Sequence, residues 1–204
     1  MITLDRAGGL WLARIDRPDK ANALTARMLH DLADIAAAAG REAQGLILTG
    51  AGDTVFSAGA DLGEARAGLA TDPVWERLSG ALAACPIPTV AALNGTLAGG
   101  AFGMALACDF RVAVPGATFF YPVAKLGFLP QPSDPVRLAA LIGPARAKMI
   151  LLAGQRIDAT EALHWGLIDR VATGDVVAAA TELLSVSIDT DRAHLAAIKA
   201  MIDG

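Results

Sequence analysis

The chain has 204 residues, of which 54% are hydrophobic and 19% are charged, and its formal net charge is −4. This length fits a single domain with a sizeable core. The negative balance argues against nucleic acid as a partner, and the chain offers no basic tail for a membrane surface. Aromatic residues supply only 5%, so the apolar content is mostly aliphatic. Such a high content of apolar residues in a small domain predicts that part of the apolar surface is buried in contacts between subunits.

The first half of the chain alternates strand-like and helix-like segments. Residues 10–15 alternate in polarity and are predicted to pair with residues 2–4 across the turn Gly8-Gly9. Thr25 is a typical N-cap for an alanine-rich helix that we expect to stop at Gly40. The sequence further predicts strands over residues 45–49 and 89–93, a short helix after Asp61 and a helix over residues 73–84.

The second half is richer in helix. Two short strands are predicted over residues 110–114 and 118–121, and Asp158 with Glu161 has the spacing of a capping box. Helices are predicted over residues 135–142, 144–152, 160–165, 176–187 and 191–202. No internal repeat is evident in the sequence. Strands and helices that alternate before a mostly helical region indicate an α/β fold with parallel strands.

The most informative segment runs from Pro88 to Asp109. A strand-like run and a turn lead into Gly-Gly-Ala-Phe-Gly at residues 99–103, which opens a helix-like stretch. Such a helix start presents free backbone N–H groups and suits an oxyanion or a phosphate. A second glycine-bearing turn lies upstream at residues 56–61. Two N–H donors converging on one oxygen would form an oxyanion hole, although each segment taken alone is more typical of a tight turn.

These two segments, in this order, resemble the enoyl-CoA hydratase/isomerase (crotonase) family. The resemblance extends to Arg-Pro-Asp-Lys-Ala-Asn-Ala-Leu at residues 17–24 and to residues 154–171. It implies an α/β fold with a crotonase-like spiral of β-β-α units and a trimer or a dimer of trimers. The single crotonase-like domain would span residues 1–204, with a spiral core at 1–142 and a shortened helical C-terminal region at 143–204.

The resemblance also bears on how the site is closed. Family members continue beyond the region of Lys199 with helices that help to cover the acyl group. The sequence here stops at Gly204. The resemblance therefore implies either a more open acyl pocket or one that a neighbouring subunit closes.

The resemblance assigns the two oxyanion donors to the backbone N–H groups of Ala60 and Gly100. It assigns the contacts to the adenine and pantetheine parts of CoA to Lys20, Ala21, Ala58, Asp61 and Leu62.

Two of these positions have ordinary alternative roles. Lys20 could be a solvated loop lysine, and Asp61 could cap the following helix.

The two glutamates that perform acid/base work in the family's hydratases are absent. Their positions hold Gly103 and Val123, and neither side chain can transfer a proton. The usual hydration by two glutamates is therefore not expected.

Candidate substitutes follow in the next segment. The family's stretch Leu-Gly-x-x-Pro-Gly-x-Gly-Gly corresponds to residues 126–134, so Asp134 stands at its last glycine. We take Asp134 as the candidate base, with Tyr121 and Gln131 as alternatives. An ordinary role is also open, because Ser-Asp-Pro at residues 133–135 is a good helix start.

The sequence thus predicts an acyl-CoA enzyme that holds an enolate, with isomerase or lyase chemistry favoured over hydration. The substrate supplies the CoA moiety, so no separate cofactor is expected, and no cluster of His, Cys and Asp has the spacing of a metal site. The alternative is a non-catalytic acyl-CoA-binding or scaffold protein that keeps the N–H donors and has lost the chemistry.

The remaining features bear on location. Cys85 and Cys108 are isolated and are expected to be buried, reduced thiols of a cytoplasmic protein. No signal peptide is expected before Asp5. The apolar stretch 89–107 contains Asn94 and four glycines, so we do not expect it to span a membrane.

Overall fold

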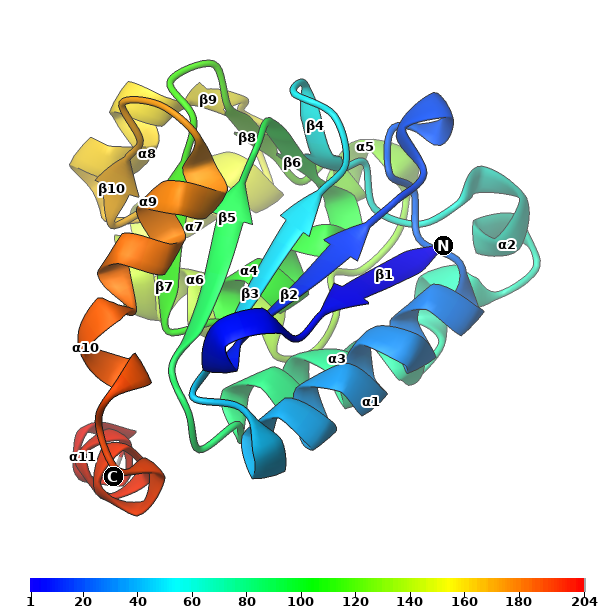
Figure 1. Ribbon diagram of the computed structural model, residues 1–204. Helices are drawn as coiled ribbons and strands as arrows, with labels where there is room; N and C mark the ends of the chain where they lie inside the picture. Colours follow the sequence, from blue (N-terminus) through cyan, green and yellow to red (C-terminus); the bar gives the residue numbers. More distant parts are fainter. Residues whose placement is uncertain (204) are drawn as a thin grey trace.

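The computed structural model describes residues 1–203 and contains two β-sheets surrounded by helices (Figure 1). The larger sheet has the strand order β1-β2-β3-β5-β7-β10 and the smaller one the order β4-β6-β8-β9. The β1–β2 and β8–β9 pairs are antiparallel, and the other pairs are parallel. The strands are Ile2–Asp5 (β1), Leu10–Ile15 (β2), Gly45–Gly50 (β3), Val55–Ser57 (β4), Thr89–Leu93 (β5), Thr96–Ala98 (β6), Phe110–Ala113 (β7), Thr118–Phe120 (β8), Ile157–Asp158 (β9) and Arg170–Val171 (β10).

A unit of two strands followed by helix occurs three times along the chain. The first strand of each unit, β3, β5 or β7, lies in the larger sheet, and the second, β4, β6 or β8, lies in the smaller one. Successive units therefore set parallel strands side by side in both sheets, and the chain winds as a spiral. The short strands β9 and β10, which follow residue 142, add one edge strand to each sheet.

Helices surround both sheets. They are Ala26–Glu42 (α1), Leu62–Arg66 (α2), Val74–Ala83 (α3), Phe102–Ala107 (α4), Val123–Leu126 (α5), Asp134–Ile142 (α6), Pro144–Leu151 (α7), Ala159–Trp165 (α8), Val176–Leu183 (α9), Ser185–Ile188 (α10) and Arg192–Asp203 (α11). Within residues 1–203, no helix has both the length and the apolar character that crossing a bilayer requires.

Both faces of the central strands β3 and β5 are buried, which explains why these two strands are apolar at nearly every position. Leu46 and Leu48 of β3 belong to the main core, which also includes residues of α1, α3 and α4. Ile47, between them, belongs to a second core with Val176 and Ala180 of α9, the orange helix in Figure 1. A strand that is covered on both sides needs no polar face.

Most predicted elements are confirmed, and the errors concern helix ends and short strands. The expected end of α1 at Gly40 is wrong, because the helix continues to Glu42. A Cβ at Gly40 would lie 3.0 Å from Cδ of Pro86, so this glycine allows close packing inside the helix. The helix expected over residues 176–187 is divided at Leu184 into α9 and α10. The strands β4, β6, β9 and β10 and the helix α5 were not predicted from the sequence.

Candidate active site

A cavity of about 220 Å³ lies where the smaller sheet meets α2, α3 and α5. Both predicted N–H donors, Ala60 and Gly100, lie on its wall. The two segments that carry them are more than thirty residues apart in sequence, and the fold brings them together. We call this space the Ala60–Gly100 cavity. Its remaining lining residues are Ala58, Leu62, Ala65, Ala70, Trp75, Ala98, Gly99, Phe120, Tyr121, Pro122, Val123, Leu126, Phe128, Leu129 and Gln131.

The backbone pairing of Ala60 leaves its N–H group free. Leu24 N–H donates to the carbonyl of Gly59 (2.7 Å), and Asp61 N–H donates to the carbonyl of Leu24 (2.8 Å). In this parallel bridge, Leu24 bonds the residues on either side of Ala60, so the N–H of Ala60 points away from Leu24. Within residues 1–203, that N–H donates no hydrogen bond.

The N–H group of Gly100 is available for a similar reason. Gly100 lies in the single helical turn Gly99–Ala101 that precedes α4, and the first N–H groups of a helical segment lack partners within it. The two donor segments touch each other at Gly59. Its φ is +90°, and a Cβ there would lie 3.0 Å from the carbonyl oxygen of Ala98 and 3.2 Å from the nitrogen of Gly100. Only glycine fits there without moving the two donors.

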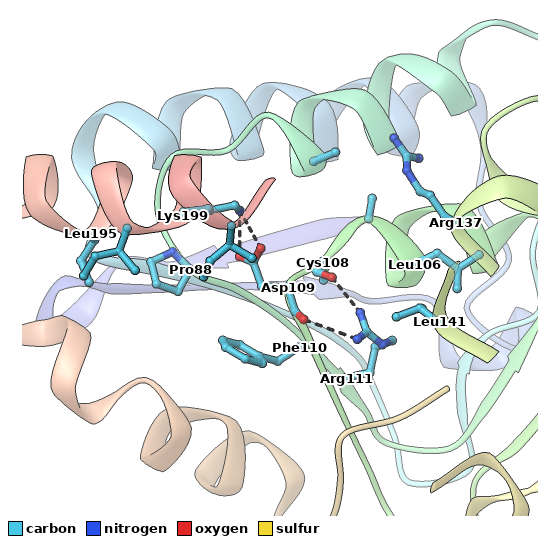
Figure 2. A pocket seen from close by; sticks show the side chains of 14 residues that line it. Pro88, Leu106, Cys108, Asp109, Phe110, Arg111, Arg137, Leu141, Leu195 and Lys199 are labelled. Atoms are coloured by element: carbon cyan, nitrogen blue, oxygen red, sulfur yellow. Dashed lines mark hydrogen bonds and ion pairs between the residues drawn. The ribbon is translucent and has the colours of Figure 1, made fainter. Parts of the chain in front are cut away.

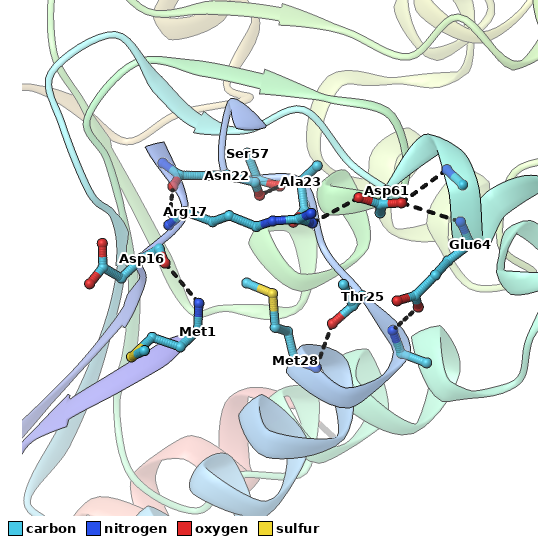
Figure 3. Close-up of polar contacts among 12 residues, drawn as sticks. Met1, Asp16, Arg17, Asn22, Ala23, Thr25, Met28, Ser57, Asp61 and Glu64 are labelled. Atoms are coloured by element: carbon cyan, nitrogen blue, oxygen red, sulfur yellow. Dashed lines mark hydrogen bonds and ion pairs between the residues drawn. The ribbon is translucent and has the colours of Figure 1, made fainter. Parts of the chain in front are cut away.

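The turn at residues 17–24 is held against the Ala60 segment by polar contacts (Figure 3). Arg17 donates to the carboxylate of Asp61 at 2.8 Å. The same carboxylate accepts hydrogen bonds from the N–H groups of Gly63 and Glu64 and so caps α2. The bond from Glu64 N–H, followed by that from Arg17, lowers the pKa of Asp61. The capping role that the sequence left open for Asp61 is therefore confirmed.

The five positions assigned to CoA divide into two groups. Ala58 and Leu62 lie on the wall of the cavity, and the Leu62 side chain is 76% exposed at its rim. Asp61 does not line the cavity, and Lys20 is exposed on the turn Pro18–Lys20. Ala21 lies next to the site, because its carbonyl accepts a hydrogen bond from Ala58 N–H (3.0 Å).

The side of the site where the family's hydratases carry glutamates is arranged differently. Val123 lies on the wall of the cavity as the first residue of α5. Gly103 is buried in α4 and faces Asp134 at the start of α6. A Cβ at Gly103 would lie only 2.7 Å from Oδ1 of Asp134. The Asp134 carboxylate therefore occupies the space that a side chain at position 103 would need.

Asp134 is 1% exposed and does not line the cavity. Its Oδ2 accepts a hydrogen bond from the Tyr121 hydroxyl (2.9 Å). Its Oδ1 is buried and has no partner within residues 1–203. Burial raises the pKa of Asp134 to about 7, and burial together with the nearby Asp134 raises the pKa of Tyr121. The candidate base is thus linked to the cavity through Tyr121, which does line it.

A larger cavity of about 620 Å³ lies under α11 and contains none of the predicted site residues (Figure 2). Lys199 Nζ lies 2.8 Å from the Asp109 carboxylate, which also accepts two hydrogen bonds from Thr89. Arg111 donates to the carbonyl of Cys108 (2.7 Å). Because these charges are satisfied within the protein, we place the candidate site in the smaller cavity.

The family model described as enoyl-CoA hydratase/isomerase matches residues 5–203. The chain belongs to the enoyl-CoA hydratase/isomerase family. The resemblance found in the sequence is thereby confirmed, and the match includes every residue that lines the Ala60–Gly100 cavity.

Relatives and solved structures support the same assignment. A Mycobacterium bovis protein named "Probable enoyl-CoA hydratase" is 37% identical over 186 residues, which cover 90% of this chain and 76% of the relative. The carnitinyl-CoA dehydratase of Escherichia coli K12 is 35% identical over 204 residues, covering 96% of this chain and 77% of the enzyme. The structure of Pseudomonas aeruginosa DspI has a TM-score of 0.92 at 32% identity and covers this whole chain and 86% of its own. The expected crotonase-like α/β fold is confirmed.

One wall of the site was not predicted from the sequence. Trp75 of α3 lies against Gly100, where a Cβ would be 3.2 Å from its ring, and its Nε1 donates to the carbonyl of Leu69 (2.8 Å). Phe128 and Leu129 also line the cavity. A tryptophan in an amphipathic helix is typical of a core position, so no sequence signal distinguished Trp75. The pairing of Tyr121 with Asp134 also had no signal, because it joins the segment after β8 to the start of α6.

Proposed function

We propose that this family member acts on an acyl-CoA thioester and stabilises an enolate with the N–H groups of Ala60 and Gly100. The observation that carries the proposal is that both groups lie on one cavity wall and donate no other hydrogen bond within residues 1–203. Negative charge gathers on the thioester oxygen when the α-carbon loses a proton. Fixed donors aimed at such an oxygen lower the barrier by about 3–4 kcal/mol each.

We further propose isomerase or lyase chemistry in place of hydration by two glutamates. Hydration needs one group to activate water and another to protonate the α-carbon. Gly103 and Val123 offer neither. Double-bond isomerisation needs only one proton-transferring site that serves two carbons in turn, and a lyase or decarboxylase forms the enolate by breaking a carbon–carbon bond. Either reaction suits a cavity with two N–H donors and one nearby acid/base pair.

A second candidate function is acyl-CoA binding without catalysis. It is favoured by the lining of the Ala60–Gly100 cavity, which among residues 1–203 includes no carboxylate, imidazole or amine side chain. Tyr121 is the one ionisable side chain on that wall, and Gln131 is the other polar one. A scaffold protein would keep the cavity and bind the thioester without changing it.

Exchange of the α-proton separates the two functions. The protein is incubated with a panel of saturated and 3-enoyl acyl-CoA thioesters in deuterated water, and deuterium in each thioester is measured by mass spectrometry. An enzyme that forms enolates incorporates deuterium at the α-carbon. Binding of the thioesters without incorporation, measured by calorimetry on the same samples, would establish the scaffold function instead.

The CoA part of the substrate is proposed to lie along two adjacent segments, the turn with Lys20 and Ala21 and the segment with Ala58, Asp61 and Leu62, and no further cofactor is proposed. Lys20 is exposed beside this turn, where its cation could meet a phosphate. A Lys20→Ala variant should bind the acyl-CoA more weakly and should bind the matching acyl-pantetheine, which lacks the nucleotide, as the wild type does. Equal loss for both ligands would contradict this placement.

We also propose a cytoplasmic trimer or dimer of trimers. Cys85 and Cys108 are both buried and free, which suits a reducing compartment. Leu129, on the cavity wall, and Val136 of α6 are 86% and 72% exposed, and such apolar side chains suit a subunit contact. Light scattering should give three or six times the 20.9 kDa mass of one chain, and a monomer at micromolar concentration would contradict the proposal.

A further inference from the structure

At positions 103 and 134, the glycine and the acidic residue of the family pattern have changed places. That pattern has glutamate at the position of Gly103 and glycine at the position of Asp134. The two positions face each other across α4 and α6, with Oδ1 of Asp134 lying 2.7 Å from where a Cβ of residue 103 would be. The carboxylate therefore enters the same space from the opposite helix.

Asp134 does little for the local structure of α6. Its side chain makes no capping bond at the helix start, where Glu76 of α3 instead accepts hydrogen bonds from Ser133 N–H (3.2 Å) and Ser133 Oγ (2.9 Å). Placing a carboxylate at 1% exposure with one oxygen unpartnered is unfavourable for folding. A buried polar group of this kind, beside a cavity, points to a chemical role.

Tyr121 is the link between this carboxylate and the cavity. It lines the cavity, and its hydroxyl donates to Oδ2 of Asp134 at 2.9 Å. Its ring stacks on Phe102 of α4, with the centroids 5.4 Å apart, which fixes the direction of the hydroxyl. A proton can therefore pass between the cavity and the buried carboxylate through the Tyr121 oxygen.

We propose that Tyr121 is the catalytic residue that exchanges a proton with the acyl group and that Asp134 is the positioning residue that accepts the tyrosine's own proton. This inference rests on the enolate chemistry proposed above. The α C–H bond breaks, its proton goes to the Tyr121 oxygen, and the phenolic proton moves to Oδ2 of Asp134. The electron pair forms the enolate, whose oxygen the N–H groups of Ala60 and Gly100 hold. The reverse transfer to the γ-carbon of a dienolate completes an isomerisation.

The charges around Asp134 set the pH at which the pair can act. Tyr121 faces it from the segment after β8, Glu76 from α3 and Arg137 from its own helix, while α4 contributes only the uncharged Gly103. Burial and the negative charge of Glu76 raise the pKa of Asp134 to about 7, against the lowering effects of Tyr121 and Arg137. Because the carboxylate is the proton acceptor, exchange should rise with pH through about 7 and then level off.

The test uses the full chain and the thioester that exchanges fastest with the wild type. Tyr121→Phe removes the hydroxyl and Asp134→Asn removes the proton acceptor, each with almost no change in volume. Both should lower α-proton exchange by about 10²–10⁴-fold while calorimetry shows unchanged acyl-CoA binding. Asp53→Asn, which makes the same change at an exposed loop carboxylate outside the cavity, leaves the pair intact and serves as the matched control.

A spectroscopic measurement makes the test independent of activity. Tyr121 is the one tyrosine in the chain, so growth on 3-fluorotyrosine labels this position alone. The fluorine resonance should shift with a midpoint near pH 7 in the wild type and should lose that transition in Asp134→Asn. Such a transition shows that Asp134 changes its protonation state beside Tyr121 at this pH, as its role of proton acceptor requires, and the loss of exchange in Tyr121→Phe separates that role from a purely structural one.

The outcomes are distinct. Wild-type exchange that survives within about threefold in Tyr121→Phe, or a fluorine resonance without a transition near pH 7, would overturn the proton pair and leave the enolate chemistry standing. No exchange in the wild type with any thioester would overturn the enolate chemistry itself, and the pair with it. If Asp134→Asn does not fold, Tyr121→Phe and the wild-type fluorine titration still decide the question.

Discussion

The two sides of the Ala60–Gly100 cavity differ in how closely they follow the family pattern. On one side the donors are backbone N–H groups, and the small residues Gly59, Ala60 and Gly100 keep them in place. On the other side the acid/base positions are changed, with Gly103 and Val123 where the pattern has glutamates. A backbone donor needs only the correct φ and enough space, whereas a proton-transferring side chain is removed by a single substitution. A family member can therefore keep the proposed oxyanion donors while its acid/base side chains change.

The largest expected effect concerns hydration of crotonyl-CoA. Because positioned acid and base groups contribute about 10²–10⁴-fold, we expect the wild type to be slower than an ordinary hydratase of the family by a factor in that range. Loss of the enoyl thioester absorbance measures the rate. A wild-type rate equal to that of the hydratase would show that the glutamate positions are misassigned and would remove the contrast between the two sides.

Restoring the family pattern sharpens this comparison. Gly103→Glu with Val123→Glu introduces both carboxylates, but a side chain at position 103 meets Oδ1 of Asp134 at 2.7 Å. The same pair with Asp134→Gly removes that conflict. We expect only the triple variant to gain hydration, and the double variant, with Asp134 retained, serves as its control. Equal rates in the two variants would mean that Asp134 does not compete for this space.

The next effect tests the backbone side. Gly59→Val replaces a residue with φ +90° and directs a side chain at the Ala98 carbonyl and the Gly100 nitrogen. Displacing the donors should lower α-proton exchange by about 10²–10³-fold. Gly68→Val is the matched control, since Gly68 has φ +115° and no atom lies within 4 Å of the place that its Cβ would take. If both variants lose exchange equally, backbone strain and not donor geometry is responsible.

The third effect is a dependence of stability on pH. The pKa of Asp134 rises from 3.8 to about 7 on folding, so the folded state binds its proton more tightly. The stabilisation from this group is complete below pH 3.8 and is lost as the pH rises through about 7. Relative to the wild type, Asp134→Asn should therefore gain roughly 2–3 kcal/mol of unfolding free energy between pH 5 and pH 8.

Urea denaturation at several pH values measures this gain. Asp53→Asn changes an exposed loop carboxyl in the same way and is the control. A difference between wild type and Asp134→Asn that stays constant from pH 5 to pH 8 would show that burial does not perturb Asp134.

The smallest effect concerns packing between α4 and α6. Gly103→Ala should destabilise the wild type by about 1–2 kcal/mol, because its methyl group meets Oδ1 of Asp134. In an Asp134→Gly background the same change should be neutral or stabilising, since alanine favours a helix over glycine by about 1 kcal/mol. A double-mutant cycle by urea denaturation measures the coupling, and additive effects would contradict the facing arrangement of the two positions.

The sequence by itself determined the local elements and the family. Periodicity, caps and turns placed most helices and the long strands, because these signals act over a few residues: Thr25 and Asp158 cap α1 and α8 as expected. The two glycine-bearing turns marked two segments that line the Ala60–Gly100 cavity for a similar reason, since a tight turn needs particular residues at particular places. The repeated unit of the fold left no repeat in the sequence, because each copy needs only its apolar pattern.

Only the tertiary structure decided what depends on neighbours far apart in the chain. The short strands β4 and β6 have too few residues to show a pattern, and they form because parallel partners lie beside them. Gly40 is a residue type typical of helix ends, but it lies inside α1 and packs against Pro86, 46 positions away in sequence. The facing positions of Gly103 and Asp134 likewise join α4 and α6, and the hydrogen bond from the Tyr121 hydroxyl to Asp134 joins the segment after β8 to α6. In a sequence such residues stand apart, and only close packing shows which side chain fills the space that another one leaves.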